Sequence, residues 1–341
     1  MPSASFSSHA RLTAALVLAL AGGAVAHAGS APPMVIERQG SFSAGGKVIG
    51  TPPNTLHCDH GVVEYQIPVK PRKYALFMWH SSGTKVWQQR WDGGEGFQSM
   101  FLRQGYPVYL WDGPRVGRAN WGCEAYTYTP KTNVDFVNLW AWRIADQKGQ
   151  WFPGVQFPVN DPAAMDEAQR GRYDEFDTTP NVLLQADAAA EAIDRIGPSV
   201  LLTNSAGGLR AMVTATKSDN VKAIVAYETP AFVFPEGEGP QGPTGPIDSV
   251  RVPMADFMKL TKIPIQIVWG DNTAGTFWDS SVKLAQQFVD IVNAHGGHAE
   301  MLMLPSVGLK GNTHIAFADL NNVQVAAQLS AFLKKNKLDI R

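Results

Sequence analysis

The chain has 341 residues, a net charge of −1 and 17% charged residues. Nucleic acids and anionic membranes bind basic patches, and the sequence has no run of basic residues, so we expect neither partner. The chain is long enough to bury a full hydrophobic core.

Residues 1–28 have the pattern of a cleavable signal peptide: a basic start, an apolar stretch and the small-x-small site Ala26-His27-Ala28. The apolar stretch is short and rich in alanine, which favours a signal peptide over the alternative of an N-terminal membrane anchor. We therefore expect a periplasmic or secreted protein. Its mature part, residues 29–341, is expected to form one domain.

The sequence contains two cysteines, Cys58 and Cys123. In an oxidising compartment they can form a disulfide, and two buried thiols are the alternative. Two cysteines are too few for a zinc cluster, so we expect no metal site of that type.

The first half of the chain predicts a sheet. Residues 34–49 and 61–69 have the pattern of antiparallel strands, and short apolar runs at 74–79 and 107–111 flank a helix at 97–104. This strand-helix-strand unit predicts parallel strands with a right-handed crossover. In residues 121–179 the alternation of strands and helices is interrupted, and aromatic residues and prolines are frequent. We therefore expect an inserted cap there.

The alternation of helices and strands resumes after the cap. The expected elements are a helix at 181–196, strands at 199–204, 221–227, 263–269 and 300–304, and helices at 209–217, 279–294 and 322–335. The Pro/Gly-rich segment at about 230–250 is expected to be a flexible loop beside the functional site.

Ser205 lies where the apolar run at 199–204 ends and a helix is expected to begin. This is the setting of the nucleophile elbow of α/β-hydrolases, in which a strained turn presents the serine to a helix N-terminus. The usual pattern is Gly-x-Ser-x-Gly, since strand and helix nearly touch there; Gly207 fits the second position and Thr203 fits the first only loosely. An ordinary strand-to-helix turn is the alternative. The two interpretations are distinguished by whether the chain also supplies a base and an acid for the serine.

A serine nucleophile needs a base, and the base needs an acid that orients it. Among eight histidines, His314 alone falls between the last strand and the last helix, where this fold places the base. Two carboxylates end the preceding strands, Glu228 and Asp271. The usual position of the acid favours Asp271. For either carboxylate the alternative is a structural role, in which it caps a turn or binds backbone amides of its own loop.

An oxyanion hole needs two backbone amides, one after the nucleophile and one in the loop after an early strand. We predict the amides of Ala206 and Ser82, with His80 shaping the turn by hydrogen bonding. Tryptophans are abundant in the first half of the chain, and most are expected in the core. His80, Trp87 and Trp121 are our candidates for a substrate pocket.

Several motifs extend this interpretation. They include Phe101-Leu102-Arg103-Gln104-Gly105-Tyr106, the segment 200–208, the segment 223–230, and Gly311-Asn312-Thr313-His314 followed by Asn321-Asn322-Val323-Gln324-Val325. In these motifs the chain resembles the α/β-hydrolase family typified by the secreted bacterial esterase 713 of Alcaligenes. The resemblance implies that Glu228, rather than Asp271, is the acid, and it implies a homodimer. The two adjacent cysteines of that family are replaced here by Ser81 and Ser82.

The sequence thus predicts an α/β-hydrolase fold, a mostly parallel central sheet with helices on both faces and an inserted cap. It predicts a serine esterase that cleaves small-molecule esters through an acyl-enzyme and needs no metal or organic cofactor. The same residues could serve a lactonase, an amidase or an acyltransferase. A non-catalytic protein that binds an apolar ligand on the hydrolase fold is the alternative from another class.

Overall fold

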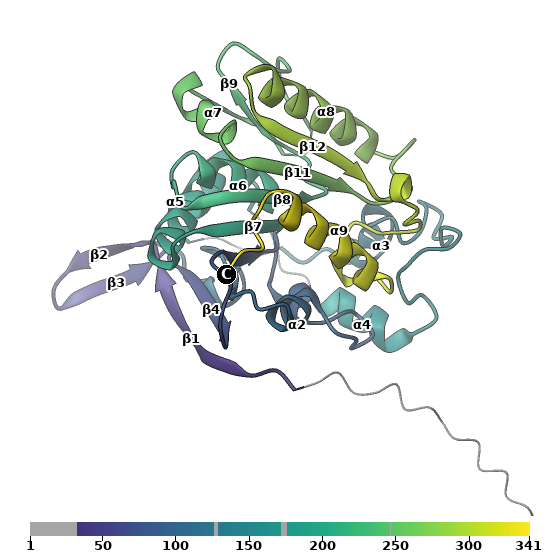
Figure 1. Cartoon of the computed structure of the whole chain (residues 1–341), viewed down its shortest axis with the longest axis horizontal. Helices are drawn as coiled ribbons and strands as arrows, with labels where there is room; N and C mark the ends of the chain where they lie inside the picture. Colours follow the sequence, from purple (N-terminus) through teal and green to yellow (C-terminus); the bar gives the residue numbers. More distant parts are fainter. Residues whose placement is uncertain (1–32, 126–128, 172–175, 246) are drawn as a thin grey trace, which may run out of the picture. The chain divides into compact units, whose positions relative to one another are not determined.

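The structure is a computed structural model that describes residues 33–125, 129–171, 176–245 and 247–341. The predicted signal peptide at residues 1–28 lies outside the described residues. Within them, eight strands form one sheet in the order β1-β4-β6-β5-β7-β8-β11-β12 (Figure 1). β1, β4 and β6 pair antiparallel, whereas all neighbours from β6 to β12 pair parallel. The predicted mostly parallel sheet is confirmed.

The strands of this sheet follow the apolar runs of the sequence. They are β1 (Ile36–Ala44), β4 (Gly61–Pro68), β5 (Ala75–Trp79), β6 (Val108–Asp112), β7 (Ser199–Asn204), β8 (Val221–Tyr227), β11 (Pro264–Trp269) and β12 (His298–Met303). Every residue of β5 and β7 is buried. Strands buried on both faces are typical of a parallel sheet covered by helices on both sides.

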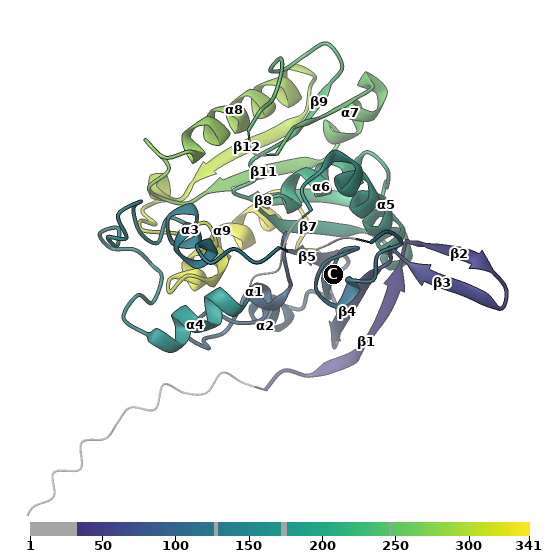
Figure 2. The ribbon, with the colours of Figure 1, turned by 180° about the vertical axis from the view of Figure 1, so that it is seen from behind.

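Helices cover both faces of the sheet (Figures 1 and 2). On one face the core joins the sheet to α5 (Thr179–Ile196), α6 (Gly207–Ala215), α7 (Met254–Leu260) and α8 (Trp278–Ala294). On the other face it joins the sheet to α1 (Lys85–Gln88), α2 (Phe97–Arg103), α4 (Pro162–Arg170) and α9 (Asn322–Lys335). The remaining helices are α3 (Val134–Ala141) and the short 3-10 helices η1 (Gly117–Ala119), η2 (Leu304–Val307) and η3 (Ala316–Ala318).

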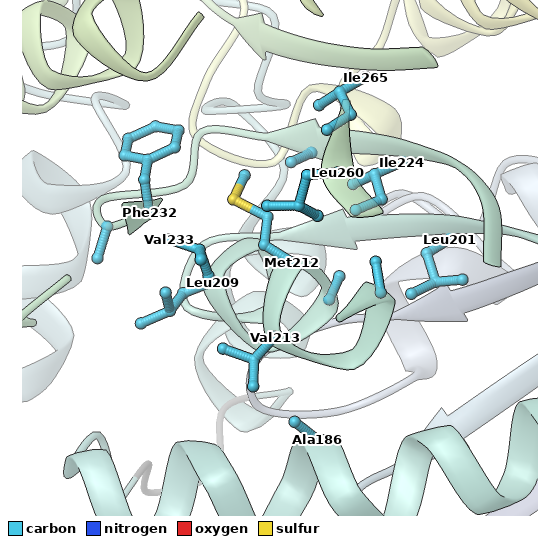
Figure 3. Close-up of a cluster of buried hydrophobic side chains, with 14 of the residues drawn as sticks. Ala186, Leu201, Leu209, Met212, Val213, Ile224, Phe232, Val233, Leu260 and Ile265 are labelled. Atoms are coloured by element: carbon cyan, nitrogen blue, oxygen red, sulfur yellow. The ribbon is translucent and has the colours of Figure 1, made fainter. Parts of the chain in front are cut away.

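Helix α6 lies in the centre of one core. Figure 3 shows its side chains Leu209, Met212 and Val213 among residues of the sheet and of neighbouring helices, including Leu201 and Ile224. All nine residues of α6 are buried. Burial of one such side chain stabilises a fold by roughly 1.5–3 kcal/mol, so the helix that follows the serine is held firmly.

A disulfide links two segments in the first half of the chain. Cys58 and Cys123 form a disulfide, so of the two alternatives left open by the sequence the structure has the disulfide. Next to it, the guanidinium of Arg115 donates to both carboxylate oxygens of Asp59 at 2.8 and 3.0 Å. β2 (Lys47–Thr51) and β3 (Asn54–Cys58) form a hairpin that extends beyond the sheet in both views (Figures 1 and 2).

Some predicted elements need correction. The strand predicted at 34–49 is divided into β1 and β2, because Gly45 and Gly46 adopt positive φ angles of 70° and 85°. The segment 230–250 is not a loop throughout: β9 (Val233–Pro235) pairs parallel with β10 (Val250–Val252). Residues 121–179, the predicted cap, contain α3 and α4. Among the described residues, no helix combines the length and apolar character that a membrane crossing requires.

Candidate active site

Ser205 occupies a strained turn between β7 and α6. Its φ angle is 53°, in the left-handed region that residues other than glycine rarely adopt. The Ser205 amide donates to the carbonyl of Tyr227 at the end of β8, 2.9 Å away, which fixes the turn to the neighbouring strand. Strain of this kind persists only where the surrounding structure enforces it, and it is common at functional sites.

Two glycines allow α6 to approach the sheet. A Cβ atom at Gly207 would lie 3.0 Å from the carbonyl oxygen of Trp79, and one at Gly208 would lie 2.4 Å from Cβ of Thr229. Thr203, which replaces the first glycine of the usual pattern, is fully buried, and its Cβ lies 3.6 Å from the Cβ position of Gly207. This is ordinary van der Waals contact, so the threonine fits.

Ser205 and His314 line the same cavity of about 200 Å³. Trp142, Trp278 and Ile247 contribute apolar surface to this cavity. Its polar side chains include His80, Asp177 and Asn204. A small cavity with apolar walls and a few convergent polar groups is the usual form of a small-molecule site.

His314 is paired with Glu228. Its Nδ1 atom lies 2.8 Å from Oε2 of Glu228, and both side chains are buried. The other carboxylate oxygen, Oε1, accepts hydrogen bonds from the Gly270 amide at 2.6 Å and from Nη2 of Arg143. Burial alone would raise the pKa of Glu228, but the charge of Arg143 and the hydrogen bond with His314 hold it below its ordinary value.

Asp271, the alternative acid, has other partners. Its carboxylate accepts from the Asn272 amide at 2.8 Å and from the Gly311 amide at 2.9 Å. Its own amide donates to the carbonyl of Asn312, 2.9 Å away. Asp271 therefore joins the loop after β11 to the histidine loop, while Glu228 contacts the imidazole itself.

The histidine loop is anchored by a fully buried carboxylate. Asp319 accepts from the Thr313 amide at 2.7 Å, the Thr313 hydroxyl at 2.8 Å and Nδ2 of Asn312 at 3.0 Å. Burial raises the pKa of Asp319 to about 7, against the lowering effect of these hydrogen bonds. The His314 ring stacks on Trp278, with ring centroids 4.5 Å apart.

The turn after β5 is organised by His80, as the sequence predicts. Its Nδ1 atom accepts hydrogen bonds from the amides of Ser82 at 3.1 Å and Gly83 at 3.2 Å, so the proton of a neutral His80 is on Nε2. The Ser82 amide is therefore committed to His80, and the prediction of Ser82 as an oxyanion donor is wrong. Ala206 is the residue that precedes α6.

The pocket predictions based on Trp87 and Trp121 are also wrong. Trp87 is fully buried and stacks on Phe317, with centroids 3.8 Å apart. Trp121 is 58% exposed and belongs to the loop that contacts Asp59. Trp142 and Trp278 line the cavity instead.

The sequence-based prediction also missed Arg143. This residue follows α3 in the predicted cap and is fully buried. Besides its bond to Glu228, its Nε atom donates to the carbonyl of Asp271 at 2.7 Å. The only signal in the sequence is one arginine inside the otherwise apolar and aromatic run Leu139-Trp140-Ala141-Trp142-Arg143-Ile144-Ala145.

Comparisons with known proteins find similarity to a lipase and to an esterase. The chain is 27% identical over 330 residues to a fungal protein named probable secreted lipase phiG, which covers 80% of this chain and 85% of the relative. It also superposes on the atomic-resolution structure of a novel bacterial esterase with a TM-score of 0.72 and 25% identity, covering 90% of this chain and 98% of that one. No family model matches the chain.

The strand order and the serine turn after a buried parallel strand are the features expected of an α/β-hydrolase. The similarity to the esterase spans nearly the whole of both chains. The chain therefore has the α/β-hydrolase fold, and its similarity to an esterase and a lipase supports a carboxylic ester hydrolase.

Proposed function

We propose that the protein is a serine esterase in which Ser205 is the nucleophile, His314 the general base and Glu228 the acid. The observation that carries the proposal is the 2.8 Å contact between His314 Nδ1 and Glu228 Oε2, with Ser205 in the same cavity. A carboxylate on Nδ1 fixes the tautomer of the imidazole, so Nε2 is left to accept the serine proton.

The reaction would follow the acyl-enzyme route. Ser205 Oγ attacks the ester carbonyl while His314 takes its proton, and the same imidazole then protonates the leaving alcohol. Water repeats the sequence on the acyl-enzyme and releases the acid. The chemistry needs neither a metal nor an organic cofactor.

For the oxyanion we retain the amide of Ala206 and assign the second amide to Ser81 in place of Ser82. Two observations support Ala206 and Ser81. Ala206 precedes α6, so its amide belongs to a helix N-terminus, where developing negative charge is stabilised. The nitrogen of Ser81 lies 3.7 Å from the Cβ position of Gly207, beside that helix start.

A fluorophosphonate probe tests the assignment, since it reacts with activated serines. The wild-type protein should be labelled and should hydrolyse p-nitrophenyl acetate, whereas Ser205→Ala should do neither. Ser306→Ala is the matched control, because Ser306 is exposed and caps η2 through the Met303 carbonyl. A folded wild-type protein that binds apolar ligands but is never labelled would support the non-catalytic alternative.

The cavity does not by itself separate ester hydrolysis from lactone hydrolysis, amide hydrolysis or acyl transfer. A panel of esters, lactones and amides, with and without an added alcohol as acceptor, ranks these activities by kcat/KM. We expect the simple esters to rank first, in line with the esterase and lipase among the similar proteins.

Export from the cytoplasm is supported by the disulfide and by the name of the secreted fungal relative. N-terminal sequencing of the protein recovered from the periplasm or the medium would test cleavage near Ala28. The homodimer implied by the resemblance stays a prediction, which analytical ultracentrifugation would check.

A further inference from the structure

A buried arginine contacts the carboxylate that orients the proposed base. We propose that Arg143 is a positioning residue: acting through Glu228, its guanidinium fixes the orientation of the carboxylate and sets the pH range in which His314 is a neutral base. This inference rests on the proposed serine-esterase function. It adds a fourth residue, from the segment predicted as a cap, to the catalytic group.

The guanidinium of Arg143 donates hydrogen bonds to two different parts of the site. Nη2 donates to Oε1 of Glu228, and Nε donates to the carbonyl of Asp271 at 2.7 Å. The guanidinium therefore joins the acid that follows β8 to the loop that follows β11. Its carbon also lies 5.8 Å from the ring centroid of Trp278, the residue that stacks on His314. One rigid fork thus contacts the acid and lies near the ring that stacks on the imidazole.

The burial of this pair argues against a role in stability alone. Both side chains have an exposed fraction of 0%. Removing two charges from water is costly, and replacing a buried ion pair by apolar residues often leaves a protein equally or more stable. A cation kept in this position is better explained by what it does to its neighbours.

The charges indicate what that effect is. With His314 neutral, Arg143 and Glu228 together carry no net charge, whereas protonation of His314 gives the buried group a net positive charge. Arg143 therefore opposes the proton on His314, while it stabilises the ionised form of Glu228. Both effects widen the pH range of the active form toward lower pH. In that form the imidazole is neutral and the carboxylate is ionised.

Other charged groups face this cluster. Asp319 lies behind the histidine loop, and Asp271 faces it from the loop after β11. On the cavity side are His80 and Asp177, the latter paired with Arg210 at 2.7 Å. A substitution at position 143 leaves these groups in place. The difference between variants therefore isolates the charge of Arg143.

The first test compares Arg143→Gln with Arg143→Lys. The acid limb of the kcat/KM profile for p-nitrophenyl acetate should move to higher pH by about one unit in R143Q, because the positive charge is lost. In R143K the limb should stay near that of the wild type, while kcat on the plateau falls because an ammonium lacks the planar fork with which the guanidinium contacts both acceptors. A folded R143Q with an unmoved acid limb overturns the proposal.

A second pair of variants covers the case in which R143Q does not fold. Glu228→Gln leaves Arg143 unpaired beside His314, whereas E228Q/R143Q has no buried charge in this position. The pH dependence of fluorophosphonate labelling should place the acid limb of the double variant about one unit above that of E228Q. Coincident limbs would overturn the proposal.

Two controls distinguish the role of Arg143 from other causes of a changed pH profile. Arg115→Gln breaks the Arg115–Asp59 pair, which lies outside the cavity, and should leave the acid limb in place. A wild-type protein that neither hydrolyses esters nor reacts with the probe would refute the proposed esterase function. An active wild-type protein with unmoved limbs would refute the role of Arg143 alone.

Discussion

His314 Nδ1 and Glu228 Oε2 are 2.8 Å apart, although the two residues are 86 positions apart in the sequence. Asp271 ends the neighbouring strand, yet both of its carboxylate oxygens accept backbone amides, those of Asn272 and Gly311. Two carboxylates that look equivalent in the sequence thus have different tasks: one contacts the imidazole and the other closes a loop.

The first prediction separates these tasks. Glu228→Gln should lower kcat by about 10³-fold or more, since an amide can hold the imidazole in the wrong tautomer and cannot compensate the imidazolium charge. Asp271→Asn should lower kcat less than tenfold and act mainly on the stability of the loop, where one hydrogen bond contributes about 1 kcal/mol. Steady-state kinetics and urea denaturation of both variants check this ranking, and the reverse ranking would make Asp271 the acid.

The second prediction concerns the ring that stacks on His314. Trp278 lies 4.5 Å from the imidazole and donates through Nε1 to the Ala141 carbonyl at 2.7 Å. An aromatic face stabilises a neighbouring cation by about 0.5–2 kcal/mol. Trp278→Phe should therefore keep a kcat several-fold higher than Trp278→Leu. Both variants lose the Nε1 hydrogen bond, so equal kcat values would show that the aromatic ring does not stabilise the imidazolium cation.

The third prediction is a pH dependence of stability caused by Asp319. Its pKa in the folded protein is about 7, above the ordinary 3.8, so the folded state binds this proton more tightly than the unfolded chain. The free energy of unfolding should therefore fall as the pH rises from about 4 to about 7, by at most about 1.4 kcal/mol per unit.

Asp319→Asn removes this titration and should flatten the profile of unfolding free energy in that window. Urea denaturation at a series of pH values measures the effect. Glu228 has the opposite sign: its lowered pKa stabilises the fold above its ordinary value of 4.5, and this contribution is lost as the pH falls. An unchanged slope in D319N would mean that Asp319 is ionised throughout.

The fourth prediction concerns the disulfide. Cys58 and Cys123 are 65 positions apart, and closing a loop of that length stabilises a fold by about 4 kcal/mol in the chain-entropy account. The double variant C58S/C123S should melt at lower temperature and keep the kcat of its folded fraction, because neither cysteine lines the cavity. Thermal melts with and without a thiol reductant, on both proteins, separate loss of the bond from side effects of the serines.

The positions of Ser205, His314 and the two candidate carboxylates could be predicted because each follows an apolar strand. In a parallel sheet such strand ends meet at one edge, so local patterns are enough to bring these residues together. Sequence pattern could not choose between Glu228 and Asp271, since both end a strand. The choice depends on which carboxylate the imidazole reaches.

Arg143, Trp142 and Trp278 could not be predicted in the same way. They contact the site through tertiary packing: Arg143 is 85 positions from Glu228 and 128 from Asp271. The error at Ser82 has a local cause, because the direction of its amide depends on the ring of His80. The abundance of tryptophan points to Trp87 and Trp121, but composition carries no information on which side chains face the cavity.

The fit of Thr203 bears on how such enzymes are recognised in genomes. The steric limits at the elbow fall on Gly207 and Gly208, whose added Cβ atoms would meet Trp79 and Thr229, whereas a threonine two residues before the serine is accommodated. A search that demands glycine on both sides of the serine would overlook this chain and any other built like it. In this chain the arrangement is carried by Ser-x-Gly-Gly after a buried strand and by Gly-Asn-x-His further along the sequence.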